Sequence, residues 1–246
     1  MTGFPSETFA FLAGIAEHNE KPWFDADRNL YDVGYVEAGK AFVEAVGPEL
    51  QKISPTVRYE PRIGASLMRV NRDTRFSRNK QPYKDHLDLF FWHGDRKGWT
   101  QPGFFLRLTA GSVWCGSGMH HFEGDVLTRY RDAVVYERSG KALVAAIEAV
   151  EAAGDYGIGS MPRKTVPRGY DKESPRARYL LWEGLPAMAQ MTVDEARQPD
   201  FSDRVLTHFR NTWPIGNGSS TRWRNRVGRW RMWHLPPCGG GSGWGV

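Results

Sequence analysis

The amino-acid sequence predicts an α+β fold, in which a central, mainly antiparallel sheet packs against N-terminal and C-terminal helices. Two observations lead to this prediction. Apolar residues recur at helical spacing towards both ends of the chain, whereas in the middle the pattern changes to a period of two. Helices at the ends and strands in the middle are typical of α+β domains and not of a βαβ repeat.

The N-terminal part of the chain is predicted to form two helices. Ser6 can cap the first, which carries an apolar stripe and ends near His18. The second begins near Asp25 or Asp27. Pro48 lies inside this second helical pattern. We expect it to kink or interrupt the helix, because proline lacks an N–H and its ring clashes with the preceding turn.

Strands are predicted where the period changes to two. Met68 and Val70 alternate with polar residues, which predicts a strand with Arg69 on the opposite face. Further strands are predicted at residues 87–91, 104–108 and 113–115, with a hairpin turn at Ala110-Gly111. Later in the chain we expect helices at 123–136 and 140–153, a loop at 154–175, a strand at 178–182 and a helix at 201–213.

Composition indicates a soluble, cytoplasmic protein. The chain has two cysteines, which argues against a secreted disulfide framework. No run approaches the ~20 apolar residues that cross a bilayer, so no membrane partner is expected. The N-terminus has no basic segment of the kind that opens a secretory signal.

The basic character of the chain comes from its last residues. The formal net charge is +5, and residues 218–246 hold five arginines and no acid. Residues 1–217 are therefore formally neutral. Nucleic-acid binding is not expected of this neutral part, and the arginines of the C-terminal segment are the place where it could arise.

Three stretches resemble a known family. They are Asn19-Glu-Lys-Pro-Trp-Phe24, Arg69-Val-Asn-Arg-Asp-Thr-Arg-Phe-Ser-Arg-Asn-Lys-Gln-Pro-Tyr-Lys84 and Pro167-Arg-Gly-Tyr-Asp-Lys-Glu-Ser-Pro175. Together they are similar to the bacterial and fungal family catalogued as domain of unknown function 2461. The resemblance covers about residues 4–217. It implies a fold and its boundaries, and it carries no activity to transfer.

The chain departs from this family after Asn217. Similar proteins continue their last helix with a Trp-Leu pair, whereas this chain has Gly218-Ser219-Ser220. Loss of one base from codons for Trp-Leu-Ile gives Gly-Ser-Ser, so we interpret the end of the chain as frameshifted. A genuine Arg/Trp tail is the alternative. We thus predict a single α+β domain at 1–217 and a disordered Arg/Gly/Trp-rich tail at 218–246.

The segment from Arg69 to Lys84 is the best candidate for a functional site. It holds six cations against the acid Asp73, on a predicted loop between two strands. Arginine and lysine heads suit phosphate or carboxylate. We therefore predict a site for a small anionic ligand, with these binding residues: Trp23, Arg69, Arg72, Arg75, Lys80, Tyr83 and Lys84. Trp23 either stacks on the ligand or covers the core.

Catalysis is not decided by the sequence. His86, next to the cationic segment, is the one weak candidate for a proton donor. His120 and His121 are adjacent and lack the spacing of metal ligands, so no metal is expected. No nucleotide-binding motif is found, and no cofactor is expected. In the alternative functional hypothesis, the chain is a non-catalytic protein- or nucleic-acid-interaction domain, and the cationic loop is an external patch.

Overall fold

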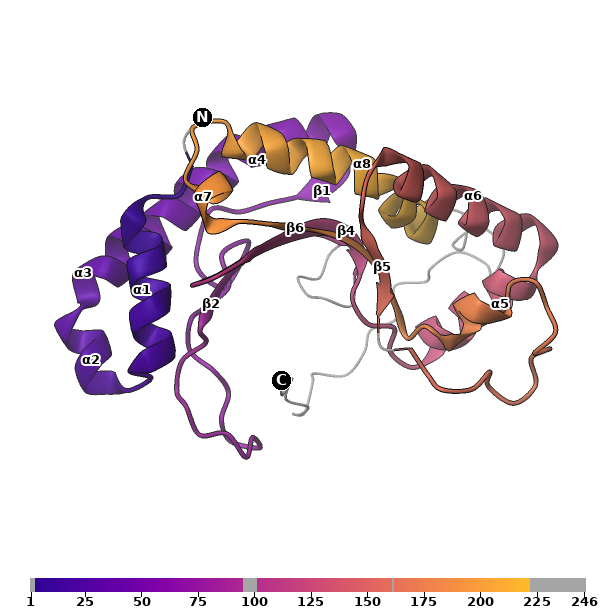
Figure 1. The fold of residues 1–246 in the computed structure, drawn as a ribbon, viewed down its shortest axis with the longest axis horizontal. Helices are drawn as coiled ribbons and strands as arrows, with labels where there is room; N and C mark the ends of the chain where they lie inside the picture. The colour runs from indigo at the N-terminus through magenta and orange to yellow at the C-terminus, as the bar shows by residue number, and fades with distance from the viewer. Residues whose placement is uncertain (1–2, 95–100, 161, 222–246) are drawn as a thin grey trace.

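One antiparallel sheet forms the centre of the protein (Figure 1). The computed structural model describes residues 3–94, 101–160 and 162–221, with side chains described as far as residue 217. Within these residues the strands lie in the order β1-β2-β3-β4-β6-β5. They are β1 (Val57–Arg58), β2 (His86–His93), β3 (Gly103–Thr109), β4 (Val113–Met119), β5 (Gly157–Ser160) and β6 (Gly184–Met191).

Helices precede and follow the central strands, which confirms the predicted α+β class. The N-terminal helices are α1 (Ser6–Glu17), α2 (Lys21–Ala26), α3 (Arg28–Leu30), the π-helix η1 (Tyr31–Glu37) and α4 (Ala38–Ile53). The later ones are α5 (Asp125–Val135), α6 (Glu137–Ala153), the 3₁₀-helix η2 (Ala177–Leu181), α7 (Val193–Ala196) and α8 (Phe201–Thr221). In Figure 1 the sheet is arched, and α4, α6 and α8 lie along its outer side.

Alternation along the strands separates two faces of the sheet. Leu87, Leu89 and Phe91 of β2 belong to the main core, together with apolar residues of α1, α4 and α8. Because successive side chains of a strand point to opposite faces, Asp88 and Phe90 lie on the other side. We call this side, turned away from α4 and α8, the inner face.

A second apolar cluster lies at the other end of the sheet. Tyr130 and Val134 of α5 pack there with Leu143 and Ile147 of α6 and with Leu180 of η2. The helical period of three to four residues brings these side chains to one face of each helix. The long connection between β5 and β6 is thereby attached to the fold through η2.

The start of the first helix differs from the prediction. Its end near His18 is confirmed, but Ser6 is the first helical residue and not the cap. The extended Pro5 takes the capping position, and the Ser6 hydroxyl donates to Glu7 at 3.1 Å. The second helical stretch also begins earlier than Asp25, at Lys21. Pro22 favours this start, because the first turn of a helix needs no N–H from it.

Pro48 does not interrupt its helix, so of the two outcomes expected there only the kink stays a prediction. α4 runs continuously from Ala38 to Ile53. Pro48 is exposed on the solvent side, whereas Val46 and Leu50 on either side of it are fully buried. Packing of this buried face holds the helix together at a position where proline removes a backbone hydrogen bond.

The strand predicted at Met68 and Val70 is not formed. The segment makes only isolated bridges, one of which joins Leu67 to Leu89 of β2. Leu67 and Val70 enter the main core, whereas Met68 packs with Phe90 on the inner face. Alternation therefore fails between Met68 and Val70, and the assignment of these two residues to one face was wrong.

Two further assignments were wrong in the C-terminal half. Residues 177–181 form the 3₁₀-helix η2, and the strand lies later, at β6. The predicted loop contains β5, which pairs with β6. A short apolar run such as Tyr179-Leu180 fits a buried helical turn as well as a strand, so periodicity does not separate the two.

The last helix is confirmed and is longer than predicted. α8 begins at Phe201 and continues to Thr221. The remainder of the predicted tail, residues 222–246, lies outside the described residues. The frameshift hypothesis therefore stays a prediction. None of the helices in the described part of the chain is long and apolar enough to span a bilayer.

Candidate functional site

The cationic segment forms an arm that projects from the β2 end of the sheet (Figure 1). Its two sides are joined by a bridge between Asn71 and Tyr83. The Arg72 N–H donates to the Pro82 carbonyl at 2.8 Å, and the Lys84 N–H donates to Val70 at 2.8 Å. We call residues 72–81 the arm tip, and residues 69–71 with 82–88 the arm base.

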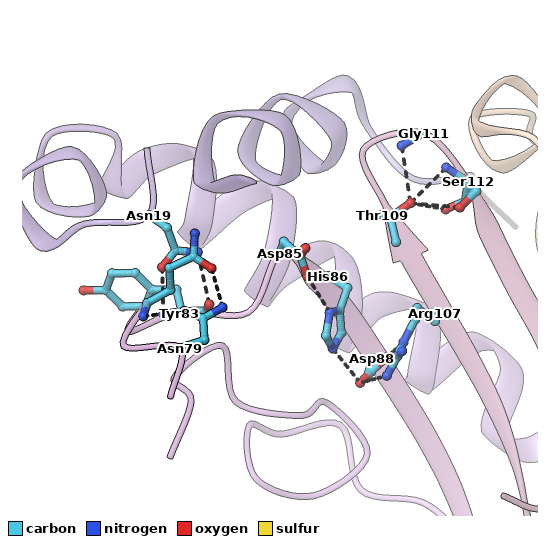
Figure 2. Close-up of polar contacts among 11 residues, drawn as sticks. Asn19, Asn79, Tyr83, Asp85, His86, Asp88, Arg107, Thr109, Gly111 and Ser112 are labelled. Atoms are coloured by element: carbon cyan, nitrogen blue, oxygen red, sulfur yellow. Dashed lines mark hydrogen bonds and ion pairs between the residues drawn. The ribbon is translucent and has the colours of Figure 1, made fainter. Parts of the chain in front are cut away.

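Tyr83 anchors the arm base to the N-terminal helices. It is buried, and its ring stacks on Phe24 with centroids 4.6 Å apart and an interplanar angle of 13°. The Asn19 side chain accepts from the Tyr83 N–H at 3.0 Å and donates to its carbonyl at 3.1 Å (Figure 2). The structure therefore places Tyr83, predicted to bind ligand, in the core.

Trp23 also lies against the core. Its ring packs beside Phe11, with centroids 6.0 Å apart. It also covers Gly14, where a Cβ atom would come within 2.1 Å of the indole. These contacts match the core-covering alternative for Trp23 that the sequence left open.

An ion-pair network crosses from β2 to β3 on the inner face (Figure 2). Asp88 and Arg107 are paired in the β2–β3 register. Arg107 Nε donates to Asp88 Oδ1 at 2.6 Å, and Nη2 donates to Oδ2 at 2.9 Å. Such a bidentate geometry is the strongest form of a carboxylate–guanidinium pair. The Asp88 side chain is 3% exposed and that of Arg107 is 42% exposed, so the pair spans from interior to surface.

His86 lies between two carboxylates. Its Nδ1 is 2.8 Å from Asp85 Oδ1, and its Nε2 is 3.3 Å from Asp88 Oδ2. A neutral imidazole has one N–H, so only the protonated ring can donate to both carboxylates. Both nitrogens face groups of the protein, and this geometry fits a residue that holds Asp88 better than a proton donor to a ligand.

The surroundings of Asp88 keep it ionised. Burial by itself raises the pKa of a carboxyl group, but the hydrogen bonds from His86 and Arg107 outweigh it. The pKa of Asp88 therefore lies well below its ordinary value. A permanent negative charge at this position attracts the cations around it.

Lys84 is the unusual cation of this group. It is partly buried, and it interacts electrostatically with Asp88, Arg107 and Arg69. Burial and the two neighbouring positive charges lower its pKa, and the attraction of Asp88 does not offset them. Within the described part of the chain, the Lys84 ammonium forms no hydrogen bond and no ion pair. We call Arg69, Lys84, His86, Asp88 and Arg107 the basal cluster.

The arm tip holds its cations apart from this cluster. Arg75 binds Asp73 through both carboxylate oxygens, at 2.9 and 2.6 Å, and holds the pKa of Asp73 at about 2. The Lys80 ammonium donates to the Thr74 carbonyl at 2.9 Å. Arg72 is tied to the opposite side of the arm only through its backbone N–H, among the described contacts.

The predicted binding residues thus divide into three groups. Arg69 and Lys84 lie in the basal cluster with His86, and Arg72, Arg75 and Lys80 lie on the arm tip. The two aromatic residues, Trp23 and Tyr83, support the core. Whether any of them binds a ligand stays a prediction.

Sequence reasoning missed Asp88 and Arg107. Each interrupts a strongly apolar strand, in Leu-Asp-Leu and Leu-Arg-Leu. Charged residues are almost never fully buried unless they are paired. An acid in one apolar strand and a base in the next therefore signal a cross-strand pair. That signal was available in the sequence.

A serine–histidine contact occurs elsewhere in the fold. Ser54 Oγ lies 2.8 Å from His93 Nε2, and His93 Nδ1 lies 3.0 Å from the Pro102 carbonyl. Ser54 is 6% exposed and His93 is 3% exposed. A nucleophilic serine needs access to its substrate, so we assign the contact to joining the end of α4 to β2. No group of three or more metal-binding side chains is found among the described residues.

Comparison with known proteins gives a family and no reaction. A family model described as "Conserved hypothetical protein (DUF2461)" matches residues 7–217. The match covers all three stretches on which the resemblance was based, and the region after it contains the predicted tail. No curated protein matches the chain.

Proposed function

We propose that this chain, which belongs to the DUF2461 family of conserved hypothetical proteins, binds a small anionic ligand at the basal cluster. The observation that carries the proposal is the environment of the Lys84 ammonium group. A partly buried ammonium group without a hydrogen bond or ion pair among the described residues is unfavourable, because burial penalises an uncompensated charge. An anion bound beside it would compensate that charge.

The neighbours of Lys84 favour the same ligand. Arg107 uses Nε and Nη2 for Asp88, and its Nη1 takes no part in that pair. Asp88 fixes the guanidinium plane, so the remaining donors are held in place before a ligand arrives. Arg69 adds a third positive charge close to Lys84. Clustered cationic donors of this kind suit phosphate or carboxylate groups.

The proposal concerns binding, and we assign no reaction. A proton transfer from His86 would require its ring to leave one of the two carboxylates that it contacts. The role supported by the geometry is to position Asp88, which in turn orients Arg107. The proposed site is therefore narrower than the whole arm on which the sequence placed it.

Two lysines of the arm provide a matched test. Lys84→Met removes the partly buried ammonium, and Lys80→Met removes an exposed one at the arm tip. We expect phosphate, sulfate or a carboxylate to raise the melting temperature of the wild type and of Lys80→Met, but not of Lys84→Met. An anion at ~100 times its Kd adds about 2.7 kcal/mol to the free energy of unfolding. Without anion, Lys84→Met should melt at the same temperature as the wild type or slightly higher.

The dependence on pH sharpens this test. The pKa of Lys84 in the folded protein lies below its ordinary value of 10.5. Anion binding favours charged Lys84, so stabilisation by sulfate should fall as pH rises through that lowered pKa. Sulfate keeps its charge over this range. A Lys84→Arg variant stays protonated and should keep its response at high pH.

Three results would refute the proposal. One is an anion response that survives in Lys84→Met. Another is a clear loss of melting temperature in Lys84→Met without anion, which would make Lys84 a structural residue. The third is the absence of any shift in the wild type across phosphorylated and carboxylate metabolites.

A further inference from the structure

The arm tip presents one aromatic ring to solvent. Phe76 is 75% exposed, far more than any other large apolar side chain among the described residues. Single exposed apolar residues are common on protein surfaces. Phe76 differs in its position, because it belongs to the arm tip, a stretch of the chain that also holds four cations.

Short-range polar contacts give the arm tip a defined shape with Phe76 outside. The Ser77 N–H and the Lys80 ammonium both donate to the Thr74 carbonyl, at 3.4 and 2.9 Å. The Gln81 N–H donates to the Asn79 side chain at 2.9 Å. None of these contacts uses the Phe76 ring, which therefore does not hold the tip together.

The charge of the arm tip is strongly positive. Arg72, Arg75, Arg78 and Lys80 stand against a single acid, Asp73. Asp73 is occupied by Arg75, and no other carboxylate of the described residues forms an ion pair with the remaining cations. The Arg75 guanidinium carbon also lies 5.8 Å from the centre of the Phe76 ring. Aromatic and cationic groups thus form one exposed surface.

We infer that the arm tip binds single-stranded nucleic acid. Sites for single strands combine cations that follow the phosphates with aromatic rings on which bases stack. Phe76 offers the stacking surface, and Arg72, Arg78 and Lys80, all within four positions of it in the chain, supply positive charges for phosphates. The amide side chains of Asn79 and Gln81, which are exposed and hydrogen-bonded to each other, also belong to the arm tip.

A membrane surface fits this tip less well. Membrane affinity grows with the apolar area that is buried in the lipid, and Phe76 is the one exposed large apolar residue of residues 72–81. The neutrality of residues 1–217 does not exclude nucleic acid. The Debye length is about 8 Å at physiological salt, so a ligand at the tip responds to the local charge and not to distant acids.

The experiment uses the full-length chain and a labelled oligonucleotide of about 12 nucleotides, within the usual site size. Anisotropy titrations compare the wild type with Phe76→Ala, Phe76→Trp and the double variant Arg78→Gln/Lys80→Gln. We expect Phe76→Ala to weaken binding about 10-fold and Phe76→Trp to keep it. The double variant should reduce the slope of log affinity against log salt by about 1.4.

Three controls separate the arm tip from other sites. Replacement of the five arginines at 222–231 by glutamine should leave the effect of Phe76→Ala unchanged, and so should Lys84→Met. Melting temperatures of the tip variants should equal that of the wild type, because Phe76 contributes little buried area. Binding that is lost with the five arginines but unaffected by Phe76→Ala would overturn the inference. So would binding to anionic lipid vesicles without binding to the oligonucleotide, or no binding at all.

Discussion

The base and the tip of the arm carry similar residues and hold them in opposite ways. At the base, Tyr83 is hydrogen-bonded to Asn19 and Lys84 interacts electrostatically with Asp88 and Arg107, and Asn19 and Arg107 are distant in the chain. At the tip, the described side-chain contacts join residues at most six positions apart, such as Lys80 and Thr74. The comparison teaches that one run of cations in a sequence can contain two regions. One is held by contacts to distant residues, and the other by contacts between neighbours in the chain.

This difference in contacts predicts that the two regions contribute differently to the stability of the domain. Contacts between distant segments form only when the whole fold forms, so the base should contribute to global stability. The tip is stabilised locally and can be changed without unfolding the domain. Tyr83 and Asp88 of the base, and Asn19, which binds the base, each have a counterpart of similar chemistry at the tip, which allows matched substitutions.

The aromatic pair should give the largest contrast. Tyr83→Ala removes a buried ring that stacks on Phe24, and we expect a loss of ~3–5 kcal/mol in the free energy of unfolding, as for other buried aromatic residues. Phe76→Ala should change it by less than ~0.5 kcal/mol, because the ring is exposed. Urea denaturation measures both. Similar losses in the two variants would contradict the division of the arm.

The acidic pair should give an intermediate contrast. Asp88→Asn leaves Arg107 without its carboxylate. We expect a loss of ~2 kcal/mol at pH 7, less than for a fully buried pair because Arg107 is 42% exposed. Asp73→Asn, at the exposed tip, should leave the unfolding midpoint unchanged.

The contrast of the acidic pair should depend on pH with a definite sign. The pKa of Asp88 is lowered in the folded protein, so its stabilisation is complete above the unfolded pKa of about 3.9. It is lost as pH falls through the lower folded pKa. The difference between wild type and Asp88→Asn should therefore shrink as the pH falls below about 4. A constant difference at acid pH would show that packing, and not charge, is responsible.

The amide pair should give the smallest contrast. Asn19→Ala removes two hydrogen bonds to the Tyr83 backbone, and we expect a loss of ~1–2 kcal/mol. Asn79→Ala removes contacts to the neighbouring Gln81 on the exposed tip and should have no measurable effect. Hydrogen exchange at the Tyr83 amide gives a local readout. Unchanged protection there in Asn19→Ala would mean that Asn19 does not fix the arm.

Much of the fold could be predicted because its strongest patterns are local. The strands β2, β3 and β4 lie where the sequence predicted them, and the hairpin turn at Ala110-Gly111 is confirmed by the pairing of Thr109 with Ser112. Predictions were wrong where tertiary packing, and not the local pattern, determined the conformation. The run at Tyr179 forms a buried 3₁₀-helix and not the predicted strand, and Met68 and Val70 point to opposite faces of the sheet.

The candidate site was predicted less completely than the fold. The cationic arm and its position between two strands follow from composition and turn residues. The sequence pattern does not separate Lys84 from Lys80, because both are lysines in the same loop. Their burial differs because Lys84 lies at the arm base, two residues before β2 begins, while Lys80 lies at the arm tip.

The sequence by itself determined the class of fold, the helix and strand periods and the cluster of cations between residues 69 and 84. Each of these depends on neighbouring residues, within one turn or one strand. Only the tertiary structure decided that Asp88 meets Arg107, that Tyr83 stacks on Phe24 and that Lys84 is left beside them without a carboxylate of its own among the described residues. These contacts depend on strand register and on helix placement, which are set by the packing of the whole chain.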